Sequence, residues 1–366
     1  MDFITLLGSV WPDNNFWATI IKLFDVNSYA WTILLFTVVL KLVLSPLDFL
    51  QRFYTNKTSR MQAKIMPEME KLKKRYGQNQ NLLYQKQNEL YKKHNVNMKG
   101  SCIVMILYMV VTLTVFLTLF SSLQSISSFQ INNQFNELNQ TYSASYNQEY
   151  YVDYLGITEE EFLNKTPEEQ SAFLATFNAD ELQTVKNQAI SNAQDKVVLK
   201  YEEVKDSWLW VNNIWRADKP TNTAILNHND FVVSTGSSVT KENYELVMAK
   251  LLNNSEINKA NGYYILSIIV VLVSFLSQWL TRKLTQPKAA NGQTIAQPGM
   301  TKILMFIMPI AMFMFTISSS AMFAIYIIAN TLITTLLTPV ITIIANKIEN
   351  KKELETKQKN KAEYSR

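Results

Sequence analysis

The stretch LLFTVVLKLVLSPLDFL, residues 34–50, decides the fold because it is long and apolar and has one cation inside it. About 20 consecutive apolar residues cross a ~30 Å hydrocarbon core as a helix. Lys41 lies inside the run, where a charged side chain costs at least ~2.5 to 3.5 kcal/mol. An ionisable residue in such a position is a functional hypothesis by default, so Lys41 is the first candidate for a functional residue.

Apolar residues are concentrated in blocks, since the 366-residue chain is 48% hydrophobic but has a mean hydropathy of -0.04. Five blocks are long enough to span a bilayer, and we therefore expect an all-α polytopic membrane protein. The predicted spans are residues 29–50, 101–127, 262–281, 303–319 and 321–346. The first fifteen residues have no basic start and no long apolar run, so we expect no cleavable secretion signal.

The charges of the segments that connect these spans indicate on which side of the membrane each segment lies. Residues 52–99 carry twelve Lys or Arg against three Asp or Glu, residues 282–302 carry four against none, and residues 347–366 carry seven against four. By the positive-inside rule these three segments are cytoplasmic. Residues 128–259 carry ten basic against nineteen acidic residues and the first 28 carry one against three, which favours an external location for both.

This topology divides the chain into ten segments, with the N-terminus outside and the C-terminus in the cytoplasm. They are an external N-terminal segment with an interfacial helix (1–28), a first span (29–50), a cytoplasmic helical hairpin (51–100), a second span (101–127), an extracellular insertion (128–261), a third span (262–281), a cytoplasmic loop (282–302), a fourth span (303–319), a fifth span (321–346) and a basic cytoplasmic tail (347–366). The helix in 1–28 is equally compatible with packing against the first span.

The hairpin at 51–100 is predicted from apolar residues at helical spacing. Gly77 can end its first helix, a second helix begins near Asn81, and Pro67 should kink the first arm or mark its true start. The apolar seam is usually only the contact between two such helices, although it could also engage a partner. Its residues are Met61, Ile65, Met69, Leu72, Tyr76, Leu83 and Leu90.

The extracellular insertion is predicted to be largely helical. Thr158 with Glu161, and Thr166 with Glu169, are helix-start signals, so we expect several short helices between about 158 and 206. The stretch SWLWVNNIW, residues 207–215, holds three tryptophans and suggests an interfacial anchor.

Composition gives little support to an enzyme, a metal site or a bound cofactor. The sequence has no G-x-x-x-x-G-K-[ST] phosphate loop, no G-x-S-x-G elbow and no H-E-x-x-H helix. Its single cysteine cannot form an intramolecular disulfide. Asp48 is the only acid within a predicted span, and at ~10 Å along the helix from Lys41 we expect it to be too far for a close ion pair.

Without a partner in the membrane, Lys41 is expected to need water from a cavity between helices that opens to one side. Hydroxyl and amide side chains of several spans could line such a cavity, although each alone is more often a helix-packing contact. The candidate groove residues are Lys41, Thr37, Tyr108, Thr112, Ser274, Gln278, Tyr326 and Asn330.

The chain resembles the YidC family of membrane protein insertases, which includes the mitochondrial and thylakoid oxidase-assembly and Albino proteins. The matching stretches are LKLVLSPLDF (40–49), MQAKIMPEMEKLKKRYG (61–77), LYKKHNVNMKGSC (90–102), SWLWVNNIWRAD (207–218), GYYIL (262–266), MFIMPI (305–310) and AIYIIAN (324–330). They cover the five-span core and leave the external segment largely unaccounted for.

The resemblance implies five transmembrane helices around a hydrophilic groove in a bacterial plasma membrane protein. Lys41 stands where the family has a cation that attracts polar or acidic parts of a nascent membrane protein, and Thr37 and Tyr326 match groove positions. The implied partners are nascent membrane proteins and the lipid bilayer, with the Sec translocon and the ribosome as candidates. No cofactor is implied.

Two other functional classes compete with an insertase. A small channel or transporter could use Lys41 as a selectivity residue, but the sequence has no internal repeat or matched broken helices. An interaction protein could use 128–261 as its working domain, but a simple anchor would not need a buried cation. The lysines of the tail could contact ribosomal RNA or belong to a solvated helix end.

Overall fold

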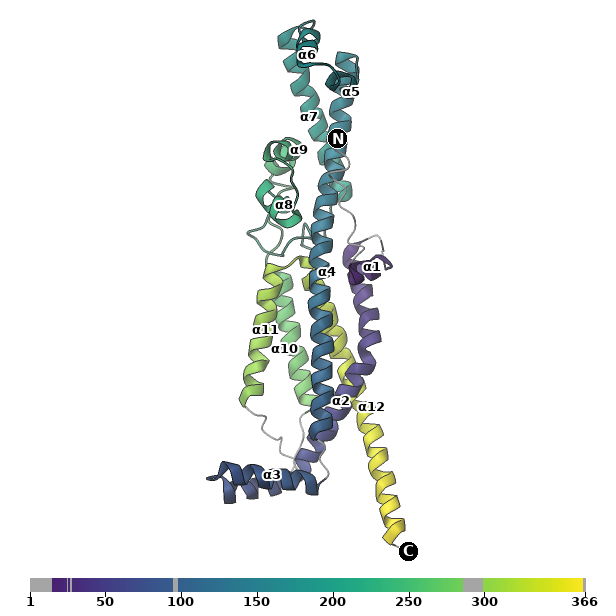
Figure 1. Ribbon diagram of the computed structural model, residues 1–366, viewed down its shortest axis with the longest axis vertical. Coiled ribbons are helices and arrows are strands. Elements are labelled where there is room, and N and C mark those ends of the chain that lie inside the picture. The colour runs from purple at the N-terminus through teal and green to yellow at the C-terminus, as the bar shows by residue number, and fades with distance from the viewer. Residues whose placement is uncertain (1–14, 25, 27, 95–97, 286–298, 365–366) are drawn as a thin grey trace. The chain divides into compact units, whose positions relative to one another are not determined.

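The computed structural model describes residues 15–24, 26, 28–94, 98–285 and 299–364, and in these ranges every regular element is a helix (Figure 1). Two isolated β-bridges, Trp208 with Val211 and Thr223 with Ala260, are the strand-like pairings found there. Most of the predicted loop at 282–302 lies outside the described residues.

The helices are α1 (Phe16–Lys22), α2 (Tyr29–Tyr76), α3 (Gln80–Lys93), α4 (Met98–Tyr146), the π-helix η1 (Asn147–Leu155), α5 (Glu159–Leu163), α6 (Pro167–Leu174), α7 (Ala179–Val204), α8 (His228–Thr235), α9 (Lys241–Asn253), α10 (Ile265–Thr285), α11 (Gly299–Ser318) and α12 (Ala321–Tyr364).

Each of the five predicted spans coincides with a helix except at residues 262–264 and 319, which confirms the all-α fold class. Within the described residues α2, α4, α10 and α12 contain stretches long and apolar enough to cross a membrane. In α11 the described apolar part, Phe306–Ser318, is shorter, so a fifth span stays a prediction. The protein is therefore a multi-pass membrane protein.

Three of these helices continue far beyond the apolar stretch that predicts them. α2 runs 48 residues through both Pro46 and Pro67, so Pro67 neither begins nor ends a helix. α4 runs 49 residues and passes directly into η1, and α12 runs 44 residues through Pro339. Good helix formers outside the bilayer let a spanning helix continue at little cost, and periodicity alone does not reveal this continuity.

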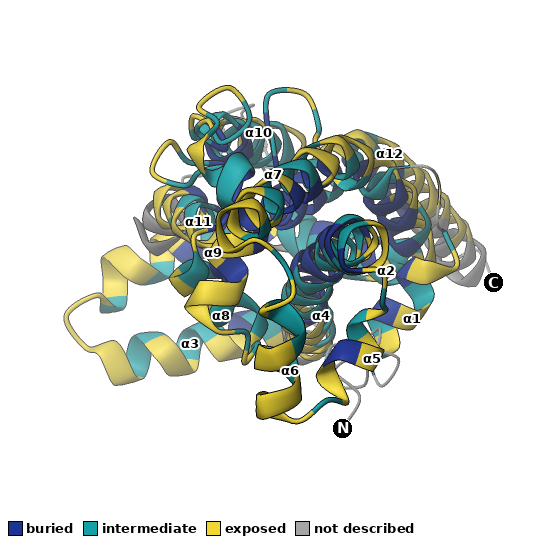
Figure 2. Cartoon of the chain, turned by 90° about the horizontal axis from the view of Figure 1, so that it is seen from above, coloured by how far each residue is buried: buried dark blue, intermediate teal, exposed yellow. Residues whose placement is uncertain are grey.

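The chain divides into two compact units. The first contains residues 1–30, 122–265 and 317–322, and the second contains residues 31–121, 266–316 and 323–366. Figure 2 shows mostly exposed residues along α3 and α6. By contrast, α12 begins with seven consecutive buried residues, 321–327.

Local sequence signals account for the helix starts of the first unit. Thr158 and Thr166 each form a capping box with the Glu three residues later, as predicted. α5 and α6 are short, as expected for this segment, whereas α7 is longer, with 26 residues. Asn178 caps α7, whose small buried residues Ala189 and Ala193 suit close packing.

Aromatic rings fill much of the interior of this unit. The rings of Phe135, Phe231 and Tyr244 pack together with centroids 4.8–5.0 Å apart. Of the three tryptophans expected to form an interfacial anchor, Trp215 is only 2% exposed and donates its indole N–H to Asp206 at 2.7 Å. The anchor interpretation is therefore wrong for Trp215, whose polar group is satisfied inside the protein.

Candidate functional site: a buried charged network on α2

Lys41 is buried in the second unit and is paired with an acid of its own helix. Its Nζ lies 3.1 Å from Oδ2 of Asp48. Lys41 is 7% exposed and Asp48 is 5% exposed. An ion pair that is both buried and hydrogen-bonded satisfies two charges that would each be costly alone.

This pair corrects two sequence-based expectations. The rise between residues seven positions apart suggested a separation too large for an ion pair, and hence that water alone must solvate Lys41. The axial rise leaves out the length of the two side chains. The flexible four-carbon stem of lysine extends along the helix while the Asp48 carboxylate leans back toward the N-terminus, and together they close the distance.

Asp48 and its neighbours extend the pair into a network. Tyr108 of α4 makes a side-chain hydrogen bond to Asp48, and Arg52, one turn further along α2, is close enough to interact electrostatically with both. The Arg52 guanidinium also donates to Oγ1 of Thr338 on α12 at 2.6 Å. Thr37, Lys41, Asp48 and Arg52 share one face of α2, since spacings of 4, 7 and 4 repeat at close to whole helical turns.

A second set of contacts holds α2 against α12 two turns below Arg52. Arg60 donates to the side-chain oxygens of Asn346 at 2.7 Å and Asn350 at 2.8 Å, and lies 3.6 Å from the carboxylate of Glu349. Charge-assisted bonds of this kind are stronger than neutral ones. Arg52 and Arg60 are eight residues apart and therefore form a basic stripe along α2. Hydroxyl and amide groups of α12 contact this stripe.

The other candidate groove residues also lie in the second unit, with differing degrees of burial. Thr37 and Tyr326 are buried, and Tyr108, Thr112, Ser274, Gln278 and Asn330 are half-buried. Thr37 and Thr112 donate to backbone carbonyls of their own helices, the behaviour expected of a hydroxyl in an apolar span. The contacts described for the chain do not join Ser274, Gln278, Tyr326 or Asn330 to the Lys41 network.

Asp48, Arg52, Thr338 and Arg60 are absent from the sequence-based selection of site residues. A search for charges sharing a helical face with Lys41 would have found Asp48 and Arg52. Nothing comparable points to Thr338, because its pairing joins residues 286 positions apart. The network has two cations and one carboxylate at its centre, so one positive charge is left over to attract an acidic group.

The predicted helical hairpin is present as the end of α2 and as α3. Ile65, Met69 and Leu90 are buried together, with Leu72 and Tyr91 packed against them. Glu68 adds an ion pair to Lys93 at 3.5 Å and a contact to His94 at 3.2 Å. Of the predicted seam residues, Met61, Tyr76 and Leu83 are only half-buried. A shallow depression of about 450 Å³ lies beside the seam, lined by Glu68, Lys71, Leu72, Lys86, Glu89, Leu90 and Lys93.

The arrangement supports electrostatic binding rather than covalent chemistry. In the described residues no group of three or more His, Cys, Asp or Glu side chains is placed to hold a metal ion. The carboxylate and the two cations pair with one another and with hydroxyl groups, an arrangement suited to binding a charged group.

The part of the chain that contains most of this network is similar to known proteins. The family model described as 60Kd inner membrane protein matches residues 20–166. That stretch is similar to the 60Kd inner membrane protein family. A curated relative, the membrane protein insertase YidC of Fusobacterium nucleatum, is 30% identical over 86 residues, which are 24% of this chain and 40% of the relative. The aligned part thus spans about two fifths of that relative's length.

The match to the 60Kd inner membrane protein family covers the helices that form most of the site. It includes α2, α3 and α4, and so it includes Lys41, Asp48, Arg52 and Tyr108. The α12 residues that meet the basic stripe, Thr338 and Asn346 among them, lie outside the matched residues. The resemblance inferred from sequence motifs to the YidC family is confirmed for this part of the chain.

Proposed function

We propose that the protein is a bacterial membrane protein insertase, with its N-terminus outside and its C-terminus in the cytoplasm. The observation that carries this proposal is the buried Lys41–Asp48–Arg52 network inside residues 20–166, the part matched by the family model. The similarity of 86 residues of the chain to a curated insertase supports it. The distribution of basic residues supports the orientation, because the segments rich in lysine and arginine are retained on the cytoplasmic side.

In this proposal, Lys41 and Arg52 receive an acidic or polar segment of a nascent membrane protein from the cytoplasm. Asp48 neutralises Lys41 while no substrate is present, which lowers the free energy of keeping a cation within an apolar helix. An incoming carboxylate competes with Asp48 for Lys41, and the unpaired charge of Arg52 favours its approach. The low dielectric of the surroundings strengthens both interactions.

The hydrophilic groove belongs to the same proposal. Half-buried polar side chains on α4, α10 and α12, including Thr112, Gln278 and Asn330, would line a hydrated path between the helices. Water and polar groups along that path reduce the free energy of desolvating a polar tail on its way across. The apolar helix of the substrate then partitions into lipid, which releases ~0.8 kcal/mol per buried CH₂.

The proposed partners are nascent membrane proteins and the lipid bilayer. The hairpin seam of Ile65, Met69 and Leu90 is small and largely surrounded by charge, which suits a brief first contact with substrate. The basic hairpin and tail could bring the ribosome close through its RNA, and cooperation with the Sec translocon would extend the range of substrates.

Depletion of the cell's own insertase and rescue by variants tests this function. Lys41→Arg should keep insertion, because a hydrated or paired point charge suffices. Lys41→Glu should impair insertion of substrates with acidic tails more than of substrates with neutral tails, because it reverses the central charge. Asp48→Asn should retain insertion of acidic substrates. Equal insertion of acidic and neutral substrates by all three variants would contradict the proposal.

A further inference from the structure

A tight turn in the first unit carries an exposed leucine at its tip. Trp208 and Val211 exchange both backbone hydrogen bonds, each 2.9 Å long, so Leu209 and Trp210 form a two-residue loop. Leu209 has φ 54° and is 69% exposed. The rings of Trp208 and Trp210 on either side are half-buried.

Three features of this turn are unfavourable for an isolated chain. The left-handed backbone conformation suits Gly or Asn and is strained for a residue as bulky as Leu209. The leucine exposes most of its apolar surface to water. The indole nitrogen of Trp210 is buried and finds no acceptor in the described part of the chain. A strained backbone conformation persists where surrounding structure or a functional contact stabilises it. We therefore expect Leu209 to contact something outside the chain.

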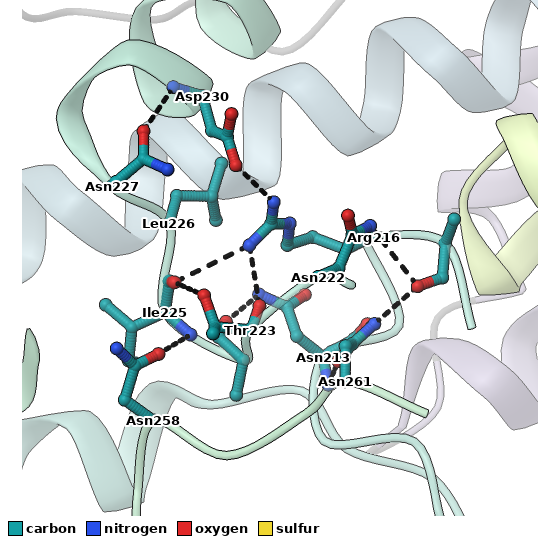
Figure 3. Close-up of polar contacts among 12 residues, drawn as sticks. Asn213, Arg216, Asn222, Thr223, Ile225, Leu226, Asn227, Asp230, Asn258 and Asn261 are labelled. Carbon is teal, nitrogen blue, oxygen red and sulfur yellow. Dashed lines mark hydrogen bonds and ion pairs between the residues drawn. The ribbon is translucent and has the colours of Figure 1, made fainter. Parts of the chain in front are cut away.

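The segment after the turn is held rigidly by buried polar groups (Figure 3). The Arg216 guanidinium donates to the Thr223 carbonyl at 2.6 Å and pairs with Asp230 at 2.6 Å. The side chain of Asn261 accepts from the Asn213 N–H at 2.7 Å and donates to its carbonyl at 2.9 Å. This hydrogen-bonded segment is the support of the turn, and it holds the turn in a fixed position.

The same support contacts residues at the start of, or directly before, three apolar helices. Ile214 and Arg216 accept backbone hydrogen bonds from Met322 and Ala321 at the start of α12, at 3.1 and 2.8 Å. The Trp215 ring packs edge-on against Tyr29, the first residue of α2, at 4.9 Å.

Asp218 makes the corresponding contact with the start of α10. Its carboxylate accepts from the Tyr263 N–H at 2.7 Å and its carbonyl accepts from Tyr264 at 3.1 Å. A Cβ at Gly262 would lie 1.8 Å from that carboxylate, so only glycine fits the close approach. Helices α2, α10 and α12 all contain candidate membrane spans, which begin at Tyr29, Ile265 and Ala321.

From these contacts we propose that the Trp208–Val211 turn inserts Leu209 into the outer leaflet of the lipid bilayer at the headgroup boundary. The lipid surface is the occupant favoured by the chemistry, because tryptophan is enriched at this interface and the support is attached to helix ends at that level. Lipid contact removes the exposed leucine from water and compensates for the strained backbone. This inference requires only the membrane topology and is independent of insertase activity.

Spin labels on the full-length protein in lipid vesicles test the proposal. The single native cysteine is replaced by Cys102→Ala, and a nitroxide is attached through Leu209→Cys or through Leu163→Cys. Leu163 is a matched control because it is also an exposed leucine, 61% exposed, but lies on α5, whose Phe162 packs against Tyr151 of η1, far along the chain from the predicted second span at 101–127. The ratio of oxygen to water-soluble nickel collisions should be several-fold higher at 209 than at 163.

Two outcomes of this measurement would overturn the proposal. Equal ratios at both positions would place Leu209 in water, and low collision rates with both reagents at 209 would mean that a protein partner or a second copy covers it.

A stability measurement separates lipid contact from a structural role of Leu209. Leu209→Asn should leave the thermal unfolding midpoint unchanged or higher in detergent, since asparagine accepts the left-handed conformation. The control Leu251→Asn, at a fully buried position of α9, should lower it. A lower midpoint for Leu209→Asn as well would show that the leucine supports the fold and would reject the proposal.

Discussion

At the scale of single residues, the account depends on how a lysine is kept within an apolar helix. Lys41 and Asp48 are each less than a tenth exposed and are 3.1 Å apart. A buried pair of this kind is not strong evidence for stability, because apolar replacements of both partners are often neutral. The presence of the Lys41–Asp48 pair is consistent with a binding site in which a cation must be available to a ligand.

A double-mutant cycle tests the pairing. Asp48→Leu alone leaves Lys41 buried without a counter-ion and should destabilise the protein by about 3–5 kcal/mol. Lys41→Met combined with Asp48→Leu should recover most of that loss, since no uncompensated charge remains. Thermal unfolding in detergent measures both, and additive effects of the two substitutions would show that the residues are not coupled.

A carboxylate of the first unit gives a pH-dependent prediction. Burial raises the pKa of Asp206, although hydrogen bonds from Trp215 and Gln134 oppose the shift. The folded protein therefore binds a proton at higher pH than the unfolded chain does. This contribution to stability should rise as the pH falls from above the raised pKa toward 3.8, the ordinary value for aspartate.

Asp206→Asn should thus leave the neutral-pH unfolding midpoint unchanged or higher and remove this part of the pH dependence. The amide oxygen can still accept from Trp215, so the hydrogen bond is kept. Asp195→Asn serves as a control, because Asp195 is 62% exposed in the side chain and pairs with Lys250 at 2.6 Å. An Asp206→Asn protein that unfolds at lower temperature than the Asp195→Asn protein at pH 7 would contradict the assignment.

At the scale of helices, some boundaries could be predicted from sequence and others could not. The capping boxes at Thr158 and Thr166 are local signals, and both helices begin where they predict. α2 passes through Pro67 because the hairpin seam around Ile65 and Met69 packs on either side of it. Such tertiary support is invisible in a pattern of single residues, and the same holds for the bonds from Arg52 and Arg60 to α12.

The hairpin seam provides the prediction at this scale. Leu90→Ala removes a side chain that is 6% exposed and should destabilise the docking of α3 by about 2–5 kcal/mol. Faster amide hydrogen exchange in α3, with unchanged exchange in α7, is the expected result. Tyr84→Ala is the control, since Tyr84 is 67% exposed on the same helix and should have little effect. Unchanged exchange in α3 after Leu90→Ala would mean that other contacts hold the helix.

At the scale of the whole chain, charge distribution and apolar blocks predict a multi-pass membrane protein, and the four long apolar helices confirm it. The family could be recognised because motifs at 40–49, 61–77 and 90–102 lie in the matched segment. The network around Lys41 is only partly predictable: the sequence indicates Lys41 and Tyr108 as candidates, whereas the axial spacing predicts that Asp48 is too far for a close ion pair.

The orientation of the chain is tested by labelling single cysteines in intact cells. In a Cys102→Ala background, Leu163→Cys should react with a membrane-impermeant maleimide, because the acidic 128–259 segment is expected outside. Tyr84→Cys, equally exposed but in the basic hairpin, should react only after the membrane is opened. The reverse pattern would show that the chain is inserted the other way round.

Photo-crosslinking of a stalled nascent membrane protein tests the central claim most directly. A photoreactive residue is placed at Thr112, half-buried one turn from Tyr108, or at its neighbour Leu113, which is 52% exposed on another face of α4. Strong crosslinks to the acidic segment from 112, weak ones from 113, and loss of the former in Lys41→Glu are the predicted result. Equal crosslinking from both positions, or crosslinks from 112 that are insensitive to the charge at residue 41, would contradict a substrate site at the Lys41 network.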